Sequence, residues 1–365
     1  MIIKSLELKD FRNFEKLVME FSAQTNILSG DNAQGKTNIL ESLYVSSVSR
    51  SHRRSRDKDM IRFGQEEAHI RTVVEKDGDA HQIDLHLRQR QAKGIAVDRI
   101  PLKRAADLFG VLNVVFFSPE DLQIIKNAPS CRRNFIDTEL CRIDRIYYEN
   151  LIRYNRVVMQ RNSLLKDAQL HPDLLSMLPV WNEQLIRYGS SIISRRELFI
   201  RDLSALTAAI HSGLTGGREE LILHYSRNTS IDAFAESLAK SQEKDIHMRT
   251  TTVGPHRDDM DFAINGVSVR RFGSQGQQRS AALSLKLAEI ELLRRQLHDA
   301  PVLLLDDVLS ELDSSRQNFL LRNIEHVQTI MTCTGLDEFV RGRIRVDRIY
   351  SVVNGTVTER SMDPE

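Results

Sequence analysis

The sequence has few cysteines and no long apolar run. Its three cysteines, Cys131, Cys141 and Cys333, form no CxxC pair, which argues against a zinc site or a disulfide framework and favours a reducing compartment. No signal peptide is recognisable at the N-terminus, and the longest apolar runs have the length of a strand rather than of a membrane span. We therefore expect a soluble, cytoplasmic protein without a membrane partner.

An excess of charge of one sign is also lacking. The 365 residues include 51 lysines and arginines against 50 aspartates and glutamates, so any affinity for nucleic acid must come from local patches. Heptad repeats do not persist anywhere, which argues against a long coiled coil. Hydrophobic residues make up 41% of the chain, enough for a core, and the length fits one large domain or two ordinary ones.

The chain changes character twice along its length. Residues 1–120 and 246–365 contain short apolar strands and tight hairpin signals, whereas residues 121–245 lose the turn-flanked strands and take helical spacing. The hairpin signals are Asp77-Gly78, Asn265-Gly266 and Asn354-Gly355. We expect an α/β domain that is split in the sequence, with a compact helical domain inserted between its two parts.

The segment GDNAQGKT matches the phosphate-binding pattern GxxxxGK[ST], and it follows an apolar strand and precedes a helix. Its backbone N–H groups are expected to surround the β-phosphate, Lys36 to contact the β and γ oxygens, and the Thr37 hydroxyl to bind Mg²⁺. The alternative is a glycine-rich turn that merely begins a helix. The predicted nucleotide-binding residues are Gly30, Asp31, Asn32, Ala33, Gln34, Gly35, Lys36 and Thr37.

A second acidic site is predicted at the end of the apolar run PVLLLDD. A buried strand that ends in acid is how a phosphate-loop protein holds its metal, so Asp306 is expected to serve Mg²⁺. Asp307 would point to the other face of the strand, where it could orient the attacking water. The alternative is a pair of solvated acids at the end of a strand.

The stretch FGSQGQQRSAAL raises the question of a second anion site. Ser274 lies three residues before Gln277, which is the capping-box spacing at the start of a helix. A helix N-terminus carries free N–H groups and a partial positive charge that favour an anion. The segment SELD, which ends at Asp313, follows the acidic pair directly.

The order of these motifs resembles that of the ATP-binding-cassette ATPases. In that family the signature helix of one subunit caps the γ-phosphate bound to the other subunit, and the SxLD loop lines the shared interface. The resemblance implies an ATP-dependent homodimer and nucleotide contacts in trans from Ser274, Gln275, Gly276, Gln277 and Asp313.

The spacing and the flanking motifs narrow the resemblance to one branch of these ATPases. The chain resembles the RecF family of bacterial recombination mediators in LKDFRNF, GDNAQGKTNILES, SRSHR, FSPEDLQIIKNAPSCRRNFID, TVGPHRDDMDFAING, GSQGQQR and LLLDDVLSELD. This implies a Rad50-like head, with Arg12 and Asn13 at the nucleotide by analogy. It also implies a weak, DNA-stimulated ATPase of recombinational repair, replication and the SOS response. The implied partners are gapped or junction DNA, RecR and RecO, with RecA loaded downstream.

Three departures from the wider cassette pattern favour slow hydrolysis. Asp307 stands where transporter subunits have glutamate, and its shorter side chain would hold the attacking water less well. The segment TIMTCTGLDEF offers Thr332 and Thr334 in place of the usual switch histidine. No glutamine directly follows the strand VVFF, and Glu120 or Gln123 is the nearest candidate for that role.

Two basic stretches are candidate DNA contacts. Residues 49–58 carry five lysines or arginines against one acid, and residues 126–161 carry eight against four. The alternative for each side chain is a solvated helix face. We favour contact with the backbone of duplex DNA, and because no base-reading module is visible, binding should be independent of sequence. The candidates are Arg50, Arg53, Arg54, Arg56, Arg132 and Arg133.

Some assignments remain open from the sequence. His256 and Arg257 in GPHRDD could serve the interface or DNA, or could pin the hairpin through ion pairs with the adjacent aspartates, and we favour the structural role. Two other functions compete with DNA repair. They are the energy subunit of a transporter, which the long spacing between the motifs opposes, and an SMC-type DNA organiser, which needs longer heptad repeats.

Overall fold

The computed structural model describes residues 1–53, 55–334 and 345–360. The chain divides into two compact units, Met1–Asp121 with Lys286–Glu365, and Leu122–Leu285. The expected division puts residues 246–285 with the α/β domain, whereas in the structure they pack within the second unit. The reason is strand pairing, because Asp259–Ile264 pairs along its length with Leu221–Ser226.

The first unit contains an antiparallel sheet in the order β2-β1-β4-β5-β6-β7. In β4 every second residue from Ala68 to Val74 is buried or half-buried, which is the alternation of a sheet with one face on the core. The expected hairpin forms at Asp77-Gly78, where both residues have positive φ. The strands are β1 (Ile2–Phe11), β2 (Phe14–Glu20), β4 (Glu67–Lys76), β5 (Asp79–Arg88), β6 (Gly94–Val97) and β7 (Ile100–Pro101).

The second sheet of this unit has the order β15-β14-β3-β13-β12-β8 and is parallel except for the edge strand β15. β3, β8 and β12 are buried at every position, as expected for parallel strands covered on both faces. The strands are β3 (Thr25–Ser29), β8 (Val114–Phe117), β12 (Val302–Leu305), β13 (Thr329–Cys333), β14 (Arg348–Val353) and β15 (Thr356–Arg360).

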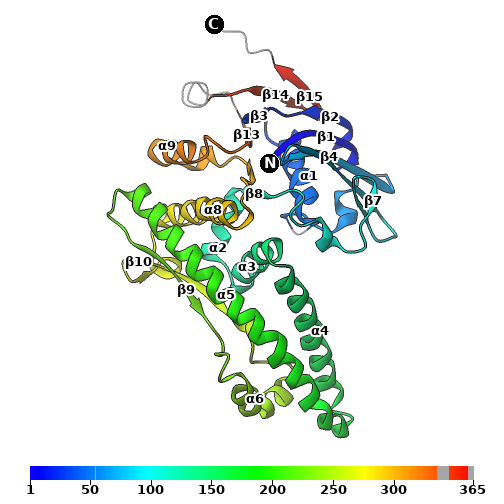
Figure 1. Cartoon of the computed structure of the whole chain (residues 1–365), viewed down its shortest axis with the longest axis vertical. Helices are drawn as coiled ribbons and strands as arrows, with labels where there is room; N and C mark the ends of the chain where they lie inside the picture. Colours follow the sequence, from blue (N-terminus) through cyan, green and yellow to red (C-terminus); the bar gives the residue numbers. More distant parts are fainter. Residues whose placement is uncertain (54, 335–344, 361–365) are drawn as a thin grey trace. The chain divides into compact units, whose positions relative to one another are not determined.

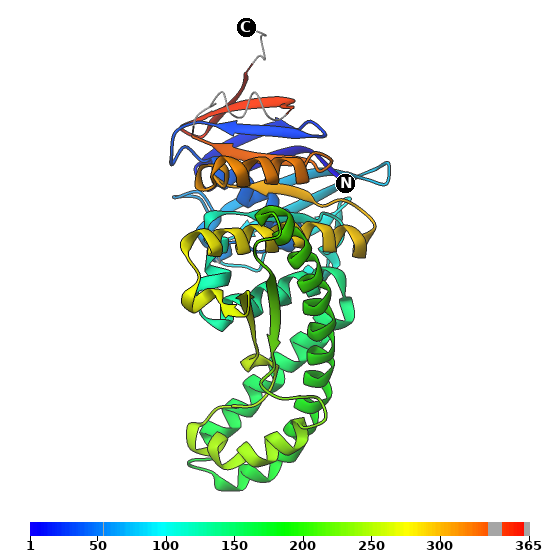
Figure 2. The same ribbon diagram turned by 90° about the vertical axis from the view of Figure 1, so that its left-hand side faces the viewer.

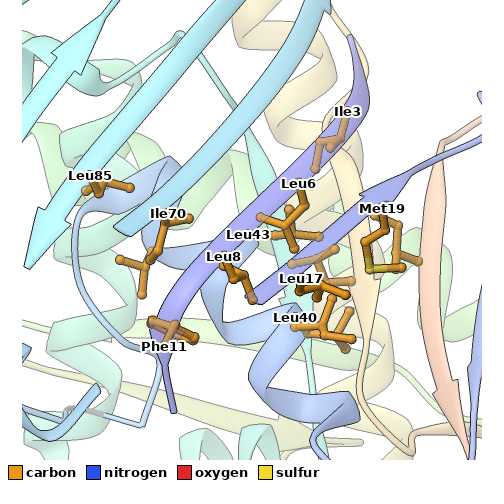
Figure 3. Packing of buried hydrophobic residues seen from close by; sticks show 14 of the residues in the cluster. Ile3, Leu6, Leu8, Phe11, Leu17, Met19, Leu40, Leu43, Ile70 and Leu85 are labelled. Carbon is orange, nitrogen blue, oxygen red and sulfur yellow. The ribbon is translucent and has the colours of Figure 1, made fainter. Parts of the chain in front are cut away.

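The helix α1 (Lys36–Val48) is buried on most of its circumference because it packs in a core shared with both sheets. Figure 3 shows Leu40 and Leu43 of this helix beside Leu6, Leu8 and Leu17 of the antiparallel sheet. The core therefore fixes the helix that follows the phosphate loop. The other helices of the unit are α9 (Ser314–Asn323) and the short 3-10 helices η1 (Asp57–Met60), η2 (Ala105–Leu108), η3 (Pro119–Asp121) and η6 (Leu309–Glu311).

The second unit is mainly helical, and its longest helices α4 and α5 pack against each other (Figures 1 and 2). α5 ends at Gly216, which has a left-handed φ of 63°, as the glycine stop in the sequence predicts. The helices are α2 (Leu122–Lys126), α3 (Pro129–Ile143), α4 (Arg145–Asp167), η4 (Pro172–Met177), α5 (Leu178–Thr215), α6 (Phe234–Met248), η5 (Pro255–Arg257), α7 (Val269–Phe272) and α8 (Gln275–Leu297), which continues into the first unit.

This unit also holds a three-stranded sheet in the order β11-β10-β9. The hairpin of β10 (Asp259–Ile264) and β11 (Val267–Ser268) turns at Asn265-Gly266 as predicted. β9 (Leu221–Ser226) interrupts the stretch for which the sequence predicts helices. Its partner β10 lies outside that stretch, so a local pattern does not reveal the pairing.

Across the described residues, no helix is both long enough and apolar enough to cross a lipid bilayer.

Candidate nucleotide site

The predicted phosphate loop connects β3 to α1, and its last glycine has a conformation that other residues rarely adopt. Gly35 has a φ of 112°, and a Cβ atom there would lie 2.5 Å from the amide nitrogen of Asn13. The next residue, Lys36, begins α1. The loop thus combines the glycine turn and the helix N-terminus that a phosphate group requires.

Lys36, at the end of the loop, is hydrogen-bonded to the backbone at its start. Its Nζ donates to the carbonyl oxygens of Gly30 at 2.5 Å and Asp31 at 2.9 Å, and its side chain is only 4% exposed. The ammonium group therefore lies inside the loop, where the phosphate oxygens of a nucleotide would accept its hydrogen bonds.

Thr37 and Asp306 meet in the structure, although they lie far apart in the sequence. The Thr37 hydroxyl donates to Asp306 Oδ1 at 2.8 Å, and the Thr332 hydroxyl donates to the same oxygen at 3.0 Å. The three residues come together because β3, β13 and β12 are adjacent parallel strands with their carboxyl ends at one edge.

The Asp306 carboxylate is suited to a cation. Burial raises the pKa of Asp306 above its usual value, and the charge of Asp307 adds to this, while the hydrogen bonds from Thr37 and Thr332 act in the opposite direction. A bound cation would favour the charged carboxylate that burial disfavours. The hydroxyl and carboxylate oxygens of Thr37 and Asp306 are the ligand type that Mg²⁺ prefers.

Asp307 is placed by a turn and not by strand alternation. β12 ends at Leu305, and Asp307 has a left-handed φ of 50°. Its N–H donates to the Thr332 hydroxyl at 2.8 Å, and its carbonyl accepts from Ser310 at 2.7 Å. The period-two argument for its direction is therefore wrong. Thr332, which occupies the place expected for the switch histidine, orients both acids.

The two residues predicted at the nucleotide by analogy have different surroundings. Asn13 contacts the loop directly, because its Nδ2 donates to the Gln34 carbonyl at 3.0 Å and its Oδ1 accepts from Asn38 at 2.9 Å. Arg12 instead forms a bidentate ion pair with the buried Glu41, at 2.7 and 2.8 Å.

The Arg12 pair fixes the α1 helix to the segment after it. Burial alone would raise the pKa of Glu41, but the hydrogen bonds from Arg12 and Ser51 outweigh it, so this pKa lies below its usual value. Arg12 also donates to the Ser55 hydroxyl at 2.8 Å and to the Asp59 carbonyl at 2.7 Å. Its role in the structure is to hold the basic segment beside the loop.

The basic segment after α1 presents exposed arginines, one of which lies near Asp306. Arg50, Arg53 and Arg56 are exposed. Arg53 donates to Asn38 Oδ1 at 3.3 Å, and its charge opposes, in small part, the rise that burial causes in the pKa of Asp306. Arg54 lies outside the described residues.

Arg132 does not fit the predicted role in DNA binding. It is 1% exposed, and its guanidinium forms a bidentate pair with Asp259 at 2.6 and 2.8 Å. The remaining nitrogen, Nη1, donates to the carbonyls of Ile124 and Asn127. Arg133 is half-buried and donates to the Asp258 carbonyl at 2.7 Å. These two arginines of the basic stretch at residues 126–161 therefore bind the start of β10 and the residue before it.

His256 and Arg257 also have structural contacts. The Thr251 carbonyl accepts from His256 Nε2 at 3.0 Å and from the Arg257 guanidinium at 3.0 Å, and the Tyr154 hydroxyl lies 2.7 Å from His256 Nδ1. The expected pairs with the adjacent aspartates do not involve these two side chains. Asp258 pairs with Arg196 instead, at 3.3 Å.

Acid should destabilise the protein partly through His256. Burial lowers the pKa of His256 to about 4, although its hydrogen bond to Thr251 acts in the opposite direction. Since the unfolded chain has the usual value near 6.5, it binds more protons below neutral pH, and the unfolding free energy falls as the pH drops from 7 to 4. The expected loss from this residue is about 2 kcal/mol at pH 5.

Urea unfolding at pH 7 and pH 5 measures this loss. His256→Gln should reduce the difference between the two pH values, whereas His247→Gln, at an exposed position of α6, should leave it unchanged. Equal pH dependence in the wild type and in His256→Gln would contradict the assignment.

The signature stretch begins α8 in the second unit, with the predicted capping box. Ser274 N–H donates to Gln277 Oε1 at 3.0 Å, and Gln277 N–H donates to Ser274 Oγ at 3.2 Å. Gln275 and Gly276 lie in the first turn of α8. Asp313 of the SxLD segment caps α9 by accepting from the Arg316 N–H at 3.0 Å.

Comparison with known proteins identifies the family. The RecF/RecN/SMC N-terminal domain family matches residues 2–358. The DNA replication and repair proteins RecF of Agathobacter rectalis and Lachnoclostridium phytofermentans are each 55% identical over 357 residues, which cover 98% of this chain and 99% of theirs.

Solved structures agree with this result. The structure described as the recombination mediator protein RecF-ATP in the RecFOR pathway has a TM-score of 0.92 at 33% identity, covering 99% of this chain and 98% of its own. The Smc head domain of Pyrococcus furiosus has a TM-score of 0.57 at 16% identity, covering 99% and 96%, and shows the fold alone. The expected fold class, a P-loop head of the ATP-binding-cassette type, is confirmed. By sequence identity and by structure over nearly its whole length, the chain belongs to the RecF family of DNA replication and repair proteins.

Proposed function

We propose that this chain is a cytoplasmic, ATP-dependent DNA-binding protein of recombinational repair, with a weak ATPase activity. The observation that carries the proposal is the 2.8 Å contact between Thr37 of the phosphate loop and Asp306 of the acidic strand. Two motifs separated by most of the chain lie together there, which supports a single site for a nucleotide and its metal. The RecF-ATP structure, which has the same fold, supports ATP as the nucleotide.

The residues of the loop and the acidic strand have distinct roles in this proposal. The ATP phosphates lie in the loop of residues 30–37, with Lys36 donating to the β and γ oxygens. Mg²⁺, held by Thr37 and Asp306, supplies charge neutralisation at the phosphates when bound. Asp307 orients the attacking water, and its short side chain predicts slow turnover.

The signature helix completes the site of a second copy. Ser274 of one subunit contacts the γ-phosphate held by Lys36 of the other, together with Gln275, Gly276 and Gln277, and Asp313 lies at the shared interface. ATP binding then closes a homodimer, and hydrolysis opens it. In this proposal residues 1–121 and 286–365 form the ATPase head and residues 122–285 the inserted domain.

The closed dimer holds DNA through exposed arginines, of which Arg50, Arg53 and Arg56 are the candidates that remain. Family membership supports gapped or junction DNA as the substrate. It also supports RecR and RecO as partners and the loading of RecA as the outcome. An ATP-dependent clamp fits such a mediator, since release is then coupled to hydrolysis.

Binding to duplex, gapped and single-stranded DNA, with and without ATP and across salt concentrations, tests this function. We expect tighter binding with ATP and a logarithm of affinity that falls with the logarithm of salt by about 0.9 per phosphate contact. Replacing Arg50, Arg53 or Arg56 singly with glutamine should lower that slope by about 1 each, whereas Arg322→Gln on α9 should not. Affinity that is equal with and without ATP would refute the clamp.

A further inference from the structure

Glu219 lies between α5 and β9, and its carboxylate reaches the start of the signature helix. Gln277 Nε2 donates to Glu219 Oε1 at 3.0 Å. The backbone on which Glu219 stands is fixed, because Asn265 exchanges two hydrogen bonds with the next residue, Glu220, at 2.9 Å each. The hairpin tip that leads toward Ser274 therefore also anchors the segment that carries Glu219.

This contact determines which way the Gln277 amide points. A carboxylate only accepts hydrogen bonds, so Glu219 selects the nitrogen of the amide and leaves its oxygen for the Ser274 N–H, at 3.0 Å. A rotated amide would place its oxygen against the carboxylate and its nitrogen against the Ser274 N–H, which removes both bonds.

The orientation of the cap decides what Ser274 can offer to a ligand. The Ser274 Oγ accepts from the Gln277 N–H at 3.2 Å, and a hydroxyl has one proton to donate besides its acceptor sites. With the acceptor side used inside the cap, the hydroxyl proton remains for a phosphate oxygen. The cap thus leaves Ser274 pre-oriented as a donor.

A buried histidine holds the other oxygen of Glu219. His211 Nε2 lies 3.1 Å from Glu219 Oε2, and its Nδ1 lies 3.1 Å from the Ser284 hydroxyl on α8. His211 and Ser284 are both 0% exposed. Glu219 is therefore tied to α8 twice, directly at the first turn through Gln277 and again further along the helix through His211.

We infer that Glu219 is the positioning residue of the signature helix, which fixes Gln277 so that Ser274 presents its hydroxyl proton to the γ-phosphate of ATP bound by a second copy of this chain. This inference rests on the proposed function. Glu219 does not touch the nucleotide in it, and it acts only through the signature of its own subunit.

Glu219→Gln tests the inference with little change of shape. A charge-assisted hydrogen bond is about twice as strong as a neutral one, so the ATP-driven dimer should weaken roughly fivefold to tenfold in sedimentation experiments. The ATP affinity of the monomer should stay at the wild-type value, and the melting temperature without nucleotide should fall by no more than a few degrees. Glu220→Gln, at the exposed neighbouring position, should dimerise normally.

Mixed dimers show whether the effect acts in trans. A subunit with Lys36→Met keeps its signature but loses its own nucleotide site. In a mixed dimer with a subunit that has an intact phosphate loop, ATP is therefore bound only by that second subunit, and the signature of the Lys36→Met subunit caps it. When Glu219→Gln is placed in the partner of the Lys36→Met subunit, it should have no effect on the mixed dimer, because the signature of that partner faces an empty site. When both substitutions are in one chain, the mixed dimer should weaken. A merely structural loss would weaken both mixed dimers alike, and would overturn the inference.

The failure of this inference and that of the proposed function give different results. Dimerisation of Glu219→Gln at wild-type affinity, while Ser274→Arg blocks dimerisation, would overturn only the role of Glu219. Normal dimerisation of both variants would overturn the in-trans site itself.

Discussion

Lys36→Met is expected to lower the affinity for ATP by at least about 100-fold. Hydrogen bonds to charged groups contribute roughly 1.5–3 kcal/mol each, and Lys36 has donors for both the β and the γ phosphate groups. Its Nζ already points into the loop, at 2.5 Å from the Gly30 carbonyl, so little rearrangement is needed to bind phosphate. Methionine has a similar length but neither charge nor donor. Calorimetric titration with ATP measures the change.

A second lysine separates this effect from a general loss of charge. Lys58→Met, at an exposed position of η1, removes the same charge outside the loop and should bind ATP like the wild type. Unchanged ATP affinity of Lys36→Met, with the fold intact by circular dichroism, would refute the assignment of the phosphate loop.

Ser274→Arg is expected to weaken the ATP-dependent dimer by more than tenfold while the monomer still binds ATP. The substitution removes a hydrogen bond to a charged phosphate oxygen, which contributes roughly 1.5–3 kcal/mol, and adds a bulky side chain at the shared site. It also removes the capping oxygen that accepts from Gln277, which costs the helix about 1 kcal/mol. Sedimentation with and without ATP measures dimerisation, and calorimetry measures ATP binding to the dilute monomer.

An exposed serine on α4 provides the matched control. Ser163→Arg introduces the same charge and volume in the same unit, away from the signature, and should dimerise normally. If Ser274→Arg forms the ATP dimer at wild-type affinity, the signature does not act in trans. If it loses ATP affinity as a monomer, the substitution acts on its own subunit.

The motifs that depend on local spacing or on strand direction could be predicted from the sequence. The capping box of Ser274 and Gln277 forms because its bonds join residues three apart. The meeting of Thr37 and Asp306 follows from a general property of parallel sheets, in which the carboxyl ends of neighbouring strands share an edge. Spacing within a motif and strand direction were sufficient for both.

The features that the sequence could not predict depend on distant partners. Arg132 stands in a basic stretch, but its partner Asp259 comes 127 residues later, so the burial of the pair has no local signal. The Arg12–Glu41 pair was missed in the same way. The sequence contains one signal for this pair. Glu41 stands on a helix with many apolar residues, and a glutamate that is buried with them needs a cation beside it.

The position of β3 in its sheet has a consequence for synthesis on the ribosome. β3 pairs only with β13 and β14 among the described strands, and Gln34 of the phosphate loop accepts from the backbone of Asn354, 320 residues further along the chain. A nascent chain that ends before these strands leaves both edges of β3 open, which invites pairing with other chains. Such a chain carries the whole GDNAQGKT segment and still lacks a formed nucleotide pocket. We therefore expect ATP to bind only after these late strands have emerged from the ribosome.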